Sequence, residues 1–262
     1  LSARFDATNT EQHMLRNKIR HHLLPLLQDE YNPKIQGALS RPADVMRVES
    51  SYLDWELEAL TTQLIHPVNR DAVRIDLTSW QTIPVALRRR LIRQAVQEAG
   101  GRSTRLTYDH VERAQALFDA GHAGQILHLP DEIGLERRKT TVLICRSTSE
   151  PYQIEMNIPG TTPIPNSDYY ITTDVVDISD SPKERPPSCV AFDVDVLPSQ
   201  LLIRSRRPGD RMTPFGMNGT KTLKKLFNEW DIPRLMRDRV PVVTDGVHIL
   251  WVAGHRRGDQ AP

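Results

Sequence analysis

The sequence predicts a multidomain α+β protein, in which a small helical domain is followed by an α+β domain with mainly antiparallel strands. Three observations support this fold class. Apolar residues of the first half recur at helical spacing, while those of the second half alternate or form short runs. A length of 262 residues suits two modules. An Asp-Gly turn at 244–246 lies between two apolar runs, which is typical of a β-hairpin.

Helices are predicted mainly in the first half of the chain. Pro25 is expected to interrupt the first helix, because proline has no amide hydrogen to donate. Ser40 and Pro42 suit the start of the second helix, and His66-Pro67 its end. Gly100-Gly101 ends the third helix. The predicted helices cover residues 12–31, 41–65, 85–99 and a segment capped by Thr107, with one short strand at 73–77.

Strands are predicted in the second half, where the apolar pattern changes period. One helix interrupts them after Thr220, with apolar residues at i, i+3, i+4 and i+7. The predicted strands cover residues 141–145, 152–158, 169–176, 189–196 and 201–207.

The composition excludes several classes of protein. No run of about 18 apolar residues is present, which argues against a transmembrane helix. The two cysteines, Cys145 and Cys189, are too few and too far apart for a disulfide framework, so a cytoplasmic location is expected. The chain starts at Leu1 and not at Met, which suggests a fragment.

Common catalytic motifs are absent from the sequence. It has no His-Glu-x-x-His, Cys-x-x-Cys or Gly-x-Ser-x-Gly pattern, no Walker loop and no dinucleotide fingerprint. We therefore predict no catalytic residue and no metal site within this chain.

Charge is distributed unevenly along the chain. Residues 1–144 carry a net charge of +1, residues 145–198 a net charge of −6, and residues 199–262 a net charge of +6. A basic module of this kind attracts polyanions, nucleic acid first among them. A solvated basic surface is the alternative interpretation.

The first basic constellation lies near the start of the chain. Arg16 and Arg20 are four residues apart, so they share a helix face, where like charges repel each other. An anion or an acidic residue between them would offset that repulsion. The alternative is a solvated amphipathic helix.

The second constellation surrounds a tight turn at Pro208-Gly209 and continues through the helix that follows it. Arginine and lysine side chains in such a module suit phosphate contacts. Asp210 is placed to fix Arg204 or Arg211, so some of these arginines are expected to be structural. The candidate phosphate-binding residues are Arg204, Arg206, Arg207, Arg211, Lys221, Lys224, Lys225, Arg234 and Arg237.

A third basic group lies on the predicted helix at 85–99. It is a weaker candidate, and we interpret it as a solvated helix face. Its members are Arg88, Arg89, Arg90 and Arg93.

Two separated groups of motifs resemble those of one known family. The first contains Asp6-x-Thr8-Asn9, then RNKIR at 16–20 and LLPLL at 23–27. The second contains IRSRRPGDRMTPFG at 203–216, KTLKKLF at 221–227, IPRLMRDRVPVV at 232–243 and ILWVAG at 249–254. The helical middle, which ends in GQILHLP at 124–130, fits between them. In this order, the motifs resemble the bacterial tRNA(Ile)-lysidine synthetases.

The resemblance implies an activity for the whole protein. Family members use ATP and Mg²⁺ to join free L-lysine to the wobble cytidine of the isoleucine tRNA with a CAU anticodon, which changes decoding from AUG to AUA. Their ATP site lies in an N-terminal domain marked by a PP-loop, Ser-Gly-Gly-x-Asp-Ser. This sequence has no PP-loop, so the chain alone is expected to be inactive as a ligase and to bind no cofactor by itself.

The resemblance also implies a domain organisation. Residues 1–31 correspond to the end of the ATP-binding domain, residues 32–140 to a helical linker domain, and residues 145–262 to the α+β tRNA-binding domain. Arg16, Asn17 and Arg20 are then expected near the active site of the full protein.

We therefore expect the tRNA-binding C-terminal portion of a tRNA(Ile)-lysidine synthetase. Two rival hypotheses remain open from the sequence. One is a stand-alone RNA-binding module without enzymatic function, and the other is a module whose basic face binds an acidic protein.

Overall fold

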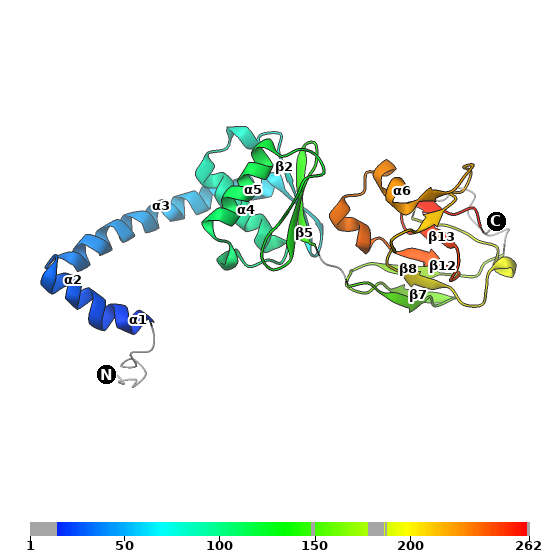
Figure 1. Cartoon of the computed structure of the whole chain (residues 1–262), viewed down its shortest axis with the longest axis horizontal. Helices are drawn as coiled ribbons and strands as arrows, with labels where there is room; N and C mark the ends of the chain where they lie inside the picture. The colour runs from blue at the N-terminus through cyan, green and yellow to red at the C-terminus, as the bar shows by residue number, and fades with distance from the viewer. Residues whose placement is uncertain (1–14, 148–149, 178–185, 187, 261–262) are drawn as a thin grey trace. The chain divides into compact units, whose positions relative to one another are not determined.

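The computed structural model describes residues 15–147, 150–177, 186 and 188–260. The chain forms two compact units, residues 1–58 and 59–262 (Figure 1). The Asp6-x-Thr8-Asn9 motif lies outside the described residues. Within the described part of the chain, no helix combines the length and the apolar character that crossing a membrane requires.

The first unit is helical, and a π-helical turn leads into Pro25. The segment runs through α1 (Leu15–Lys18), the π-helix η2 (Ile19–Leu23) and α2 (Leu24–Glu30). The amide of Leu24 donates to the carbonyl of Ile19, so the turn closes five residues back. Because proline has no amide hydrogen, a wide turn accommodates it without ending the helix. The expected interruption at Pro25 is therefore a local change of pitch.

The long helix α3 (Ile35–Leu64) begins before the predicted start at Ser40-Pro42. Asn32 holds this earlier start, since its side chain accepts from the Lys34 amide at 2.9 Å and its carbonyl from the Ile35 amide. Pro42 lies within the helix. Several large apolar side chains of this helix are exposed: Leu39, Val45, Met46, Val48, Tyr52 and Trp55.

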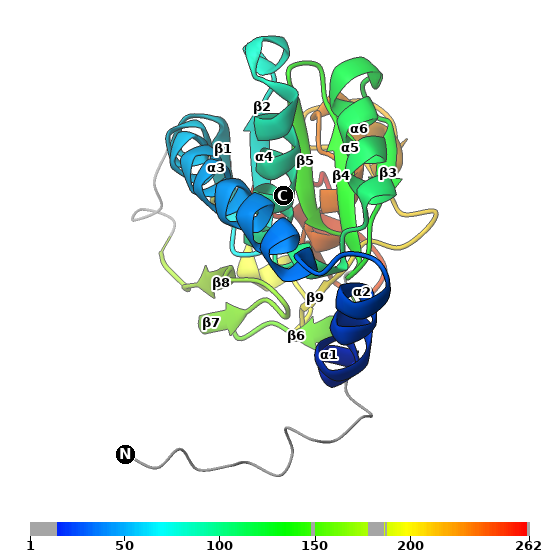
Figure 2. The same ribbon diagram turned by 90° about the vertical axis from the view of Figure 1, so that its left-hand side faces the viewer.

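The second unit contains two lobes. We call residues 59–147 the first lobe and residues 150–260 the second lobe. The first lobe has a five-stranded antiparallel sheet in the order β1-β2-β5-β4-β3. Helices α4 and α5 cover one face of this sheet, as two views show (Figures 1 and 2). The strands are β1 (Ile65–Asn69), β2 (Ala72–Asp76), β3 (Ile126–His128), β4 (Ile133–Arg137) and β5 (Thr141–Arg146), and the helices are η3 (Trp80–Thr82), α4 (Val85–Glu98), η4 (Ser103–Arg105) and α5 (Tyr108–Ala120).

Sequence patterns predicted the helices of the first lobe better than its sheet. Thr107 caps α5 as predicted, and α4 ends before Gly100. The apolar run at 141–145 forms the centre of this sheet, where β5 pairs with both β2 and β4. Its inner residues are buried on both faces, which explains a continuous apolar run. The division into residues 1–31, 32–140 and 145–262 remains a prediction.

The second lobe contains another five-stranded antiparallel sheet, in the order β14-β13-β12-β9-β6, with two short hairpins beside it. The sheet is formed by β6 (Gln153–Glu155), β9 (Leu202–Arg204), β12 (Val242–Thr244), β13 (Ile249–Val252) and β14 (Arg256–Arg257). The other elements are β7 (Gly160–Pro163), β8 (Tyr170–Thr173), η6 (Val194–Val196), β10 (Arg211–Met212), β11 (Lys221–Thr222), α6 (Leu223–Glu229) and η7 (Arg234–Arg239). The predicted α+β class with antiparallel strands is confirmed.

Successive residues of the second sheet enter different cores. Val243 and Trp251 pack in the core that contains Ile164 and Ile203. Val242 and Val252 pack instead against Phe227 and the rest of α6. Side chains of a strand alternate between faces, so a sheet with a core on each side has no polar face. The predicted hairpin around Asp245-Gly246 joins β12 to β13.

The strand predicted at 189–196 is wrong. Residues 194–196 form a short 3-10 helix, and the Asp193 carboxylate accepts from the Asp195 amide at 3.0 Å. This local bond competes with strand pairing. Val190 and Phe192 still pack against the second-lobe core, which accounts for the apolar positions of the pattern.

The Arg88 side chain is buried and serves the first lobe. Its Nε atom donates to the Ile83 carbonyl and its Nη2 atom to the Gln81 carbonyl, each at 2.7 Å. Its Nη1 atom lies 3.2 Å from an Asp119 carboxylate oxygen, and its guanidinium lies over the Trp80 ring. The interpretation of this basic group as a solvated face is therefore wrong for Arg88.

Replacing Arg88 with alanine is expected to lower the free energy of unfolding by about 2–4 kcal/mol, because two carbonyls and one carboxylate lose their donor. Urea unfolding followed by tryptophan fluorescence measures this loss. Arg113→Ala, at an exposed position of α5, is the matched control and should change stability by no more than about 0.5 kcal/mol. Equal effects of the two substitutions would contradict the structural role of Arg88.

Candidate nucleic-acid interface

Arg204 and Asp210 form a buried ion pair at the base of the Pro208-Gly209 turn. The Nη1 and Nη2 atoms of Arg204 donate to the two Asp210 carboxylate oxygens at 2.8 and 2.9 Å. Asp210 also accepts from the Arg207 amide at 2.7 Å, which closes the turn. Gly209 has a φ of +87°, a conformation that favours glycine. The Arg204 side chain is thus engaged within the fold. This agrees with the expectation that Asp210 fixes one of the nearby arginines.

Two further candidate cations have acidic partners. Arg206 lies 2.8 Å from an Asp238 carboxylate oxygen. The Lys221 ammonium donates to both Glu229 oxygens, at 3.0 and 2.8 Å. These two cations remain partly exposed.

Arg237 is buried between α6 and η7. Its Nε atom donates to the Ile232 carbonyl at 3.1 Å and its Nη2 atom to the Asn228 side chain at 2.6 Å. Burial lowers the pKa of its guanidinium, which still remains charged at neutral pH. Arg237 therefore joins α6 to η7.

The remaining candidate cations are exposed. Arg207 is exposed and donates to the Gln153 side chain at 2.6 Å. Within the described part of the chain, no hydrogen bond or ion pair engages the charged groups of Arg211, Lys224, Lys225 and Arg234.

Three of these exposed cations lie close together. Arg211 pairs in register with Thr222, whose side chain caps α6. Lys224 and Lys225 stand in the first turn of that helix, opposite its buried residues Leu226 and Phe227. We call Arg211, Lys224 and Lys225 the hairpin cations. Unpaired cations on one short segment are free to bind phosphates.

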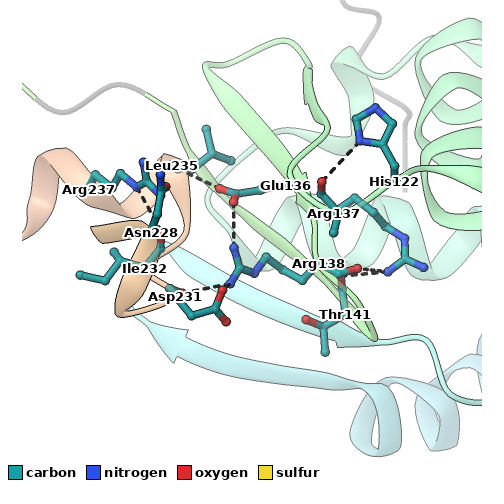
Figure 3. A network of polar contacts seen from close by, with 11 residues as sticks. His122, Glu136, Arg137, Arg138, Thr141, Asn228, Asp231, Ile232, Leu235 and Arg237 are labelled. Atoms are coloured by element: carbon teal, nitrogen blue, oxygen red, sulfur yellow. Dashed lines mark hydrogen bonds and ion pairs between the residues drawn. The ribbon is translucent and has the colours of Figure 1, made fainter. Parts of the chain in front are cut away.

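A polar network joins the two lobes of the second unit (Figure 3). The Glu136 carboxylate, on β4, has no exposed surface. It accepts from the Leu235 amide at 2.9 Å and from Arg138 Nη1 at 3.2 Å. Arg138 Nη2 also donates to the Asp231 carbonyl at 2.9 Å and forms an ion pair with the Asp231 carboxylate. The network fixes the start of η7 against the first sheet.

Apolar packing accompanies this network. Ala72, Leu143 and Cys145 of the first lobe pack with Leu235 and Met236 of η7. Burial raises the pKa of the Cys145 thiol to about 11, so it remains a neutral apolar group. The sheet face not covered by helices is thus buried by the second lobe.

A cleft of about 2030 Å³ adjoins the network, and eight Arg or Lys and six Asp or Glu residues line it. Its charge is therefore nearly balanced. Several of its cations also have protein partners, since Arg239 donates to the Arg146 carbonyl and Arg146 to the Gly100 carbonyl, each at 3.2 Å. The cleft is for this reason a weaker candidate for phosphate binding than the hairpin cations.

The first constellation is exposed to solvent. Arg16 on α1 and Arg20 on η2 have exposed side chains, and Asn17 between them is partly buried. The wide π-helical turn begins at Ile19, so the regular α-helical spacing assumed for the two arginines does not hold throughout. No cluster of three or more His, Cys, Asp or Glu side chains suited to a metal ion occurs among the residues that the structure describes.

Comparison with known proteins assigns both lobes. Residues 75–143 match the model of the TilS substrate binding domain, and residues 201–261 match that of the TilS substrate C-terminal domain. The chain carries both TilS domains. The first match lies within the first lobe, and the second covers the later part of the second lobe, which includes the hairpin cations and η7.

Curated relatives are similar in sequence to this chain over almost its whole length. A tRNA(Ile)-lysidine synthase of Geobacter sulfurreducens is 33% identical over 267 residues, covering 100% of this chain and 56% of the relative. That of Caldanaerobacter subterraneus subsp. tengcongensis is 32% identical over 264 residues, covering 99% of this chain and 56% of the relative. The chain thus spans about half the length of these relatives and matches their C-terminal part.

A solved structure is also similar, the crystal structure of a TilS C-terminal domain. It is 35% identical, with a TM-score of 0.40, and the similarity covers 43% of this chain and 86% of that one.

Sequence reasoning missed the groups that join the two TilS domains. Glu136 and Arg138 lie in GLERR, which shows no alternating pattern. Their partners, Leu235 and Asp231, are more than 90 residues away in the chain. The one unusual feature of this segment is an acidic residue, Glu136, in a buried strand. The sequence of such a short segment does not reveal that it is buried.

Arg204→Ala is expected to lower the free energy of unfolding by about 3–5 kcal/mol, because it leaves the buried Asp210 carboxylate without its partner. Arg204→Lys should recover only part of this loss, since an ammonium cannot form the two parallel bonds of the guanidinium. Urea unfolding measures both variants, with Lys225→Ala as the control that should differ from the parent by no more than about 0.5 kcal/mol. A neutral Arg204→Ala substitution would show that the ion pair is dispensable.

Proposed function

We propose that this chain is the tRNA-binding C-terminal portion of a tRNA(Ile)-lysidine synthase, which joins lysine to the wobble cytidine of an isoleucine tRNA with a CAU anticodon. The observation that carries the proposal is the group of hairpin cations, exposed within a domain that matches the TilS substrate C-terminal domain. The relatives bear the corresponding enzyme name along the whole chain. The rival reading as a stand-alone RNA-binding module is not favoured.

The division of the basic residues supports this proposal. Arg204, Arg237 and Lys221 form specific contacts within the lobe, so they shape the surface. The hairpin cations have no such contacts among the described residues, so binding a phosphate costs them no existing ion pair. Among the sequence-predicted residues, we propose that Arg207, Arg211, Lys224, Lys225 and Arg234 contact tRNA directly, while the others hold the fold.

Replacing Lys224 and Lys225 together with alanine is expected to weaken tRNA binding and to flatten its salt dependence. Each lost phosphate contact lowers the slope of log K against log salt by about 0.7–0.9, so the double variant should lose about 1.4–1.8. Filter binding of an isoleucine tRNA transcript at several salt concentrations gives the slope. Lys34→Ala, at an exposed position of the first unit and outside the cleft, is the control. An unchanged slope in the double variant would exclude these lysines as phosphate contacts.

The ligase chemistry is proposed for the full-length protein. The sequence of this chain has no PP-loop, the motif that marks the ATP site in the family it resembles. We assign ATP, Mg²⁺ and lysine binding to the remaining part of the full-length protein. By itself the chain should release no AMP in the presence of ATP, lysine and tRNA. A cytoplasmic location is likewise proposed, with Cys145 and Cys189 as free thiols.

In the full-length protein, Arg20→Ala is expected to reduce lysidine formation by about one to two decades with little loss of stability. A charge-assisted contact to a phosphate or nucleotide contributes about 1.5–3 kcal/mol, whereas an exposed arginine without such a contact changes stability by no more than about 0.5 kcal/mol. The single-turnover rate and the thermal stability are measured on the same variant. Arg41→Ala, on the exposed surface of α3, serves as control. Normal turnover of Arg20→Ala would remove this helix from the active site.

A further inference from the structure

An exposed aromatic ring lies at the tip of the hairpin that carries the hairpin cations. Strands β10 and β11 are joined by the loop 213–220, and within it the Phe215 side chain is 49% exposed and Met217 39% exposed. Single exposed apolar side chains are common on protein surfaces, so exposure alone does not make Phe215 a binding residue. What distinguishes Phe215 is how its loop and its ring are held.

Hydrogen bonds to residues 256–258 hold the loop in place. The Phe215 amide donates to the Arg257 carbonyl at 2.9 Å, and Arg256 Nη2 donates to the Phe215 carbonyl at 3.0 Å. Pro214 forms a bridge with Gly258, where a Cβ atom would lie 2.4 Å from the Ile249 carbonyl oxygen. Only glycine permits this approach, so the loop is fixed to β14 and the strand behind it.

The ring itself is oriented by a cation. The Arg257 guanidinium lies between two aromatic rings, 4.8 Å from the centroid of Phe215 and 4.9 Å from that of Phe192. Cation–π contacts of this kind fix the ring plane. Arg257 thus covers one face of the ring, while about half of Phe215 remains exposed to solvent.

We propose that Phe215 stacks on an unpaired base of the bound RNA, whose neighbouring phosphates contact the hairpin cations. A flat, oriented ring next to unpaired cations is the arrangement by which proteins bind single-stranded nucleic acid, with stacking for the base and charge for the backbone. Arg211 stands at one end of the hairpin and Lys224 and Lys225 follow its other end. The hairpin cations thus favour a polyanionic ligand. The Phe215 ring favours a polyanion whose bases are accessible for stacking. This proposal rests on the proposed RNA-binding function and adds an unpaired nucleotide to its ligand.

The test uses the whole chain and two RNA probes. One is a hairpin with a 3′ overhang of about four nucleotides, and the other is the same hairpin with a blunt end. The parent chain should bind the overhang probe more tightly. Stacking of one base is equivalent to about 5- to 150-fold in affinity, so Phe215→Ala should weaken binding of the overhang probe by that factor and leave the blunt probe unchanged.

Other variants separate stacking from charge and from folding. Phe215→Trp should keep the preference for the overhang, while Phe215→Leu, which keeps an apolar side chain of similar bulk, should lose it. Neither change removes a phosphate contact, so the salt slope should remain that of the parent, in contrast to the slope of the lysine double variant. Val247→Ala, at a highly exposed apolar position of another hairpin, is the matched control and should change nothing.

The outcomes distinguish the two proposals. If the parent chain binds neither probe, the RNA-binding function fails and the stacking site fails with it. If the parent binds both probes equally, or if Phe215→Ala and Phe215→Leu weaken both probes alike, only the stacking site is overturned. Normal RNA binding by Phe215→Leu would assign the exposed ring to another partner, such as a protein, and would also overturn the proposal.

Discussion

The buried carboxylate of Glu136 is the interaction on which the arrangement of the two TilS domains depends. A carboxylate without solvent must receive hydrogen bonds from the protein, because an unmatched buried charge costs several kcal/mol. Its two donors come from different domains, Arg138 beside it and the Leu235 amide at the start of η7. Gly134, two residues earlier on β4, leaves space for the Leu235 side chain. The sheet of one domain therefore fixes the basic segment of the other.

The cations of the C-terminal domain are of two kinds, those with partners in the protein and those exposed to solvent. Arg204 and Arg237 have two or more specific partners each, and they hold a turn and a helix pair. Lys224 and Lys225 have exposed ammonium groups. Arginine predominates in the first kind because its planar fork forms several bonds at once, while lysine suits a point contact with a phosphate. A net charge of +6 over residues 199–262 thus overstates the charge that is available to a ligand.

Sequence patterns predicted the fold where local periodicity and local burial agree. The buried stripe of α4, the Thr107 cap and the hairpin at Asp245-Gly246 were all readable, because each depends on residues within one or two turns of the chain. The sheet of the first lobe was largely missed, since β4 contains a glycine and a buried glutamate, which obscure its strand pattern.

The candidate site could be predicted only in part, because several of its contacts join residues that are far apart in the chain. The sequence located the basic module and placed Asp210 beside an arginine. The partners of Arg138, Arg237 and Arg206 were not readable, because each depends on how segments meet in space. The stacking of Phe215 on Arg257 was also inaccessible, since 42 residues separate them in the chain.

The exposed apolar side chains of α3 have a consequence for handling the chain in solution. Val45, Val48, Tyr52 and Trp55 lie within about three turns of one helix, and each is more than half exposed. Apolar area of this kind leaves water when two molecules meet, so it favours reversible self-association that rises with concentration and with kosmotropic salt. High salt, which weakens the attraction of basic surfaces for polyanions, strengthens this apolar attraction. The ionic strength that keeps the chain free of nucleic acid during purification therefore works against keeping it monodisperse.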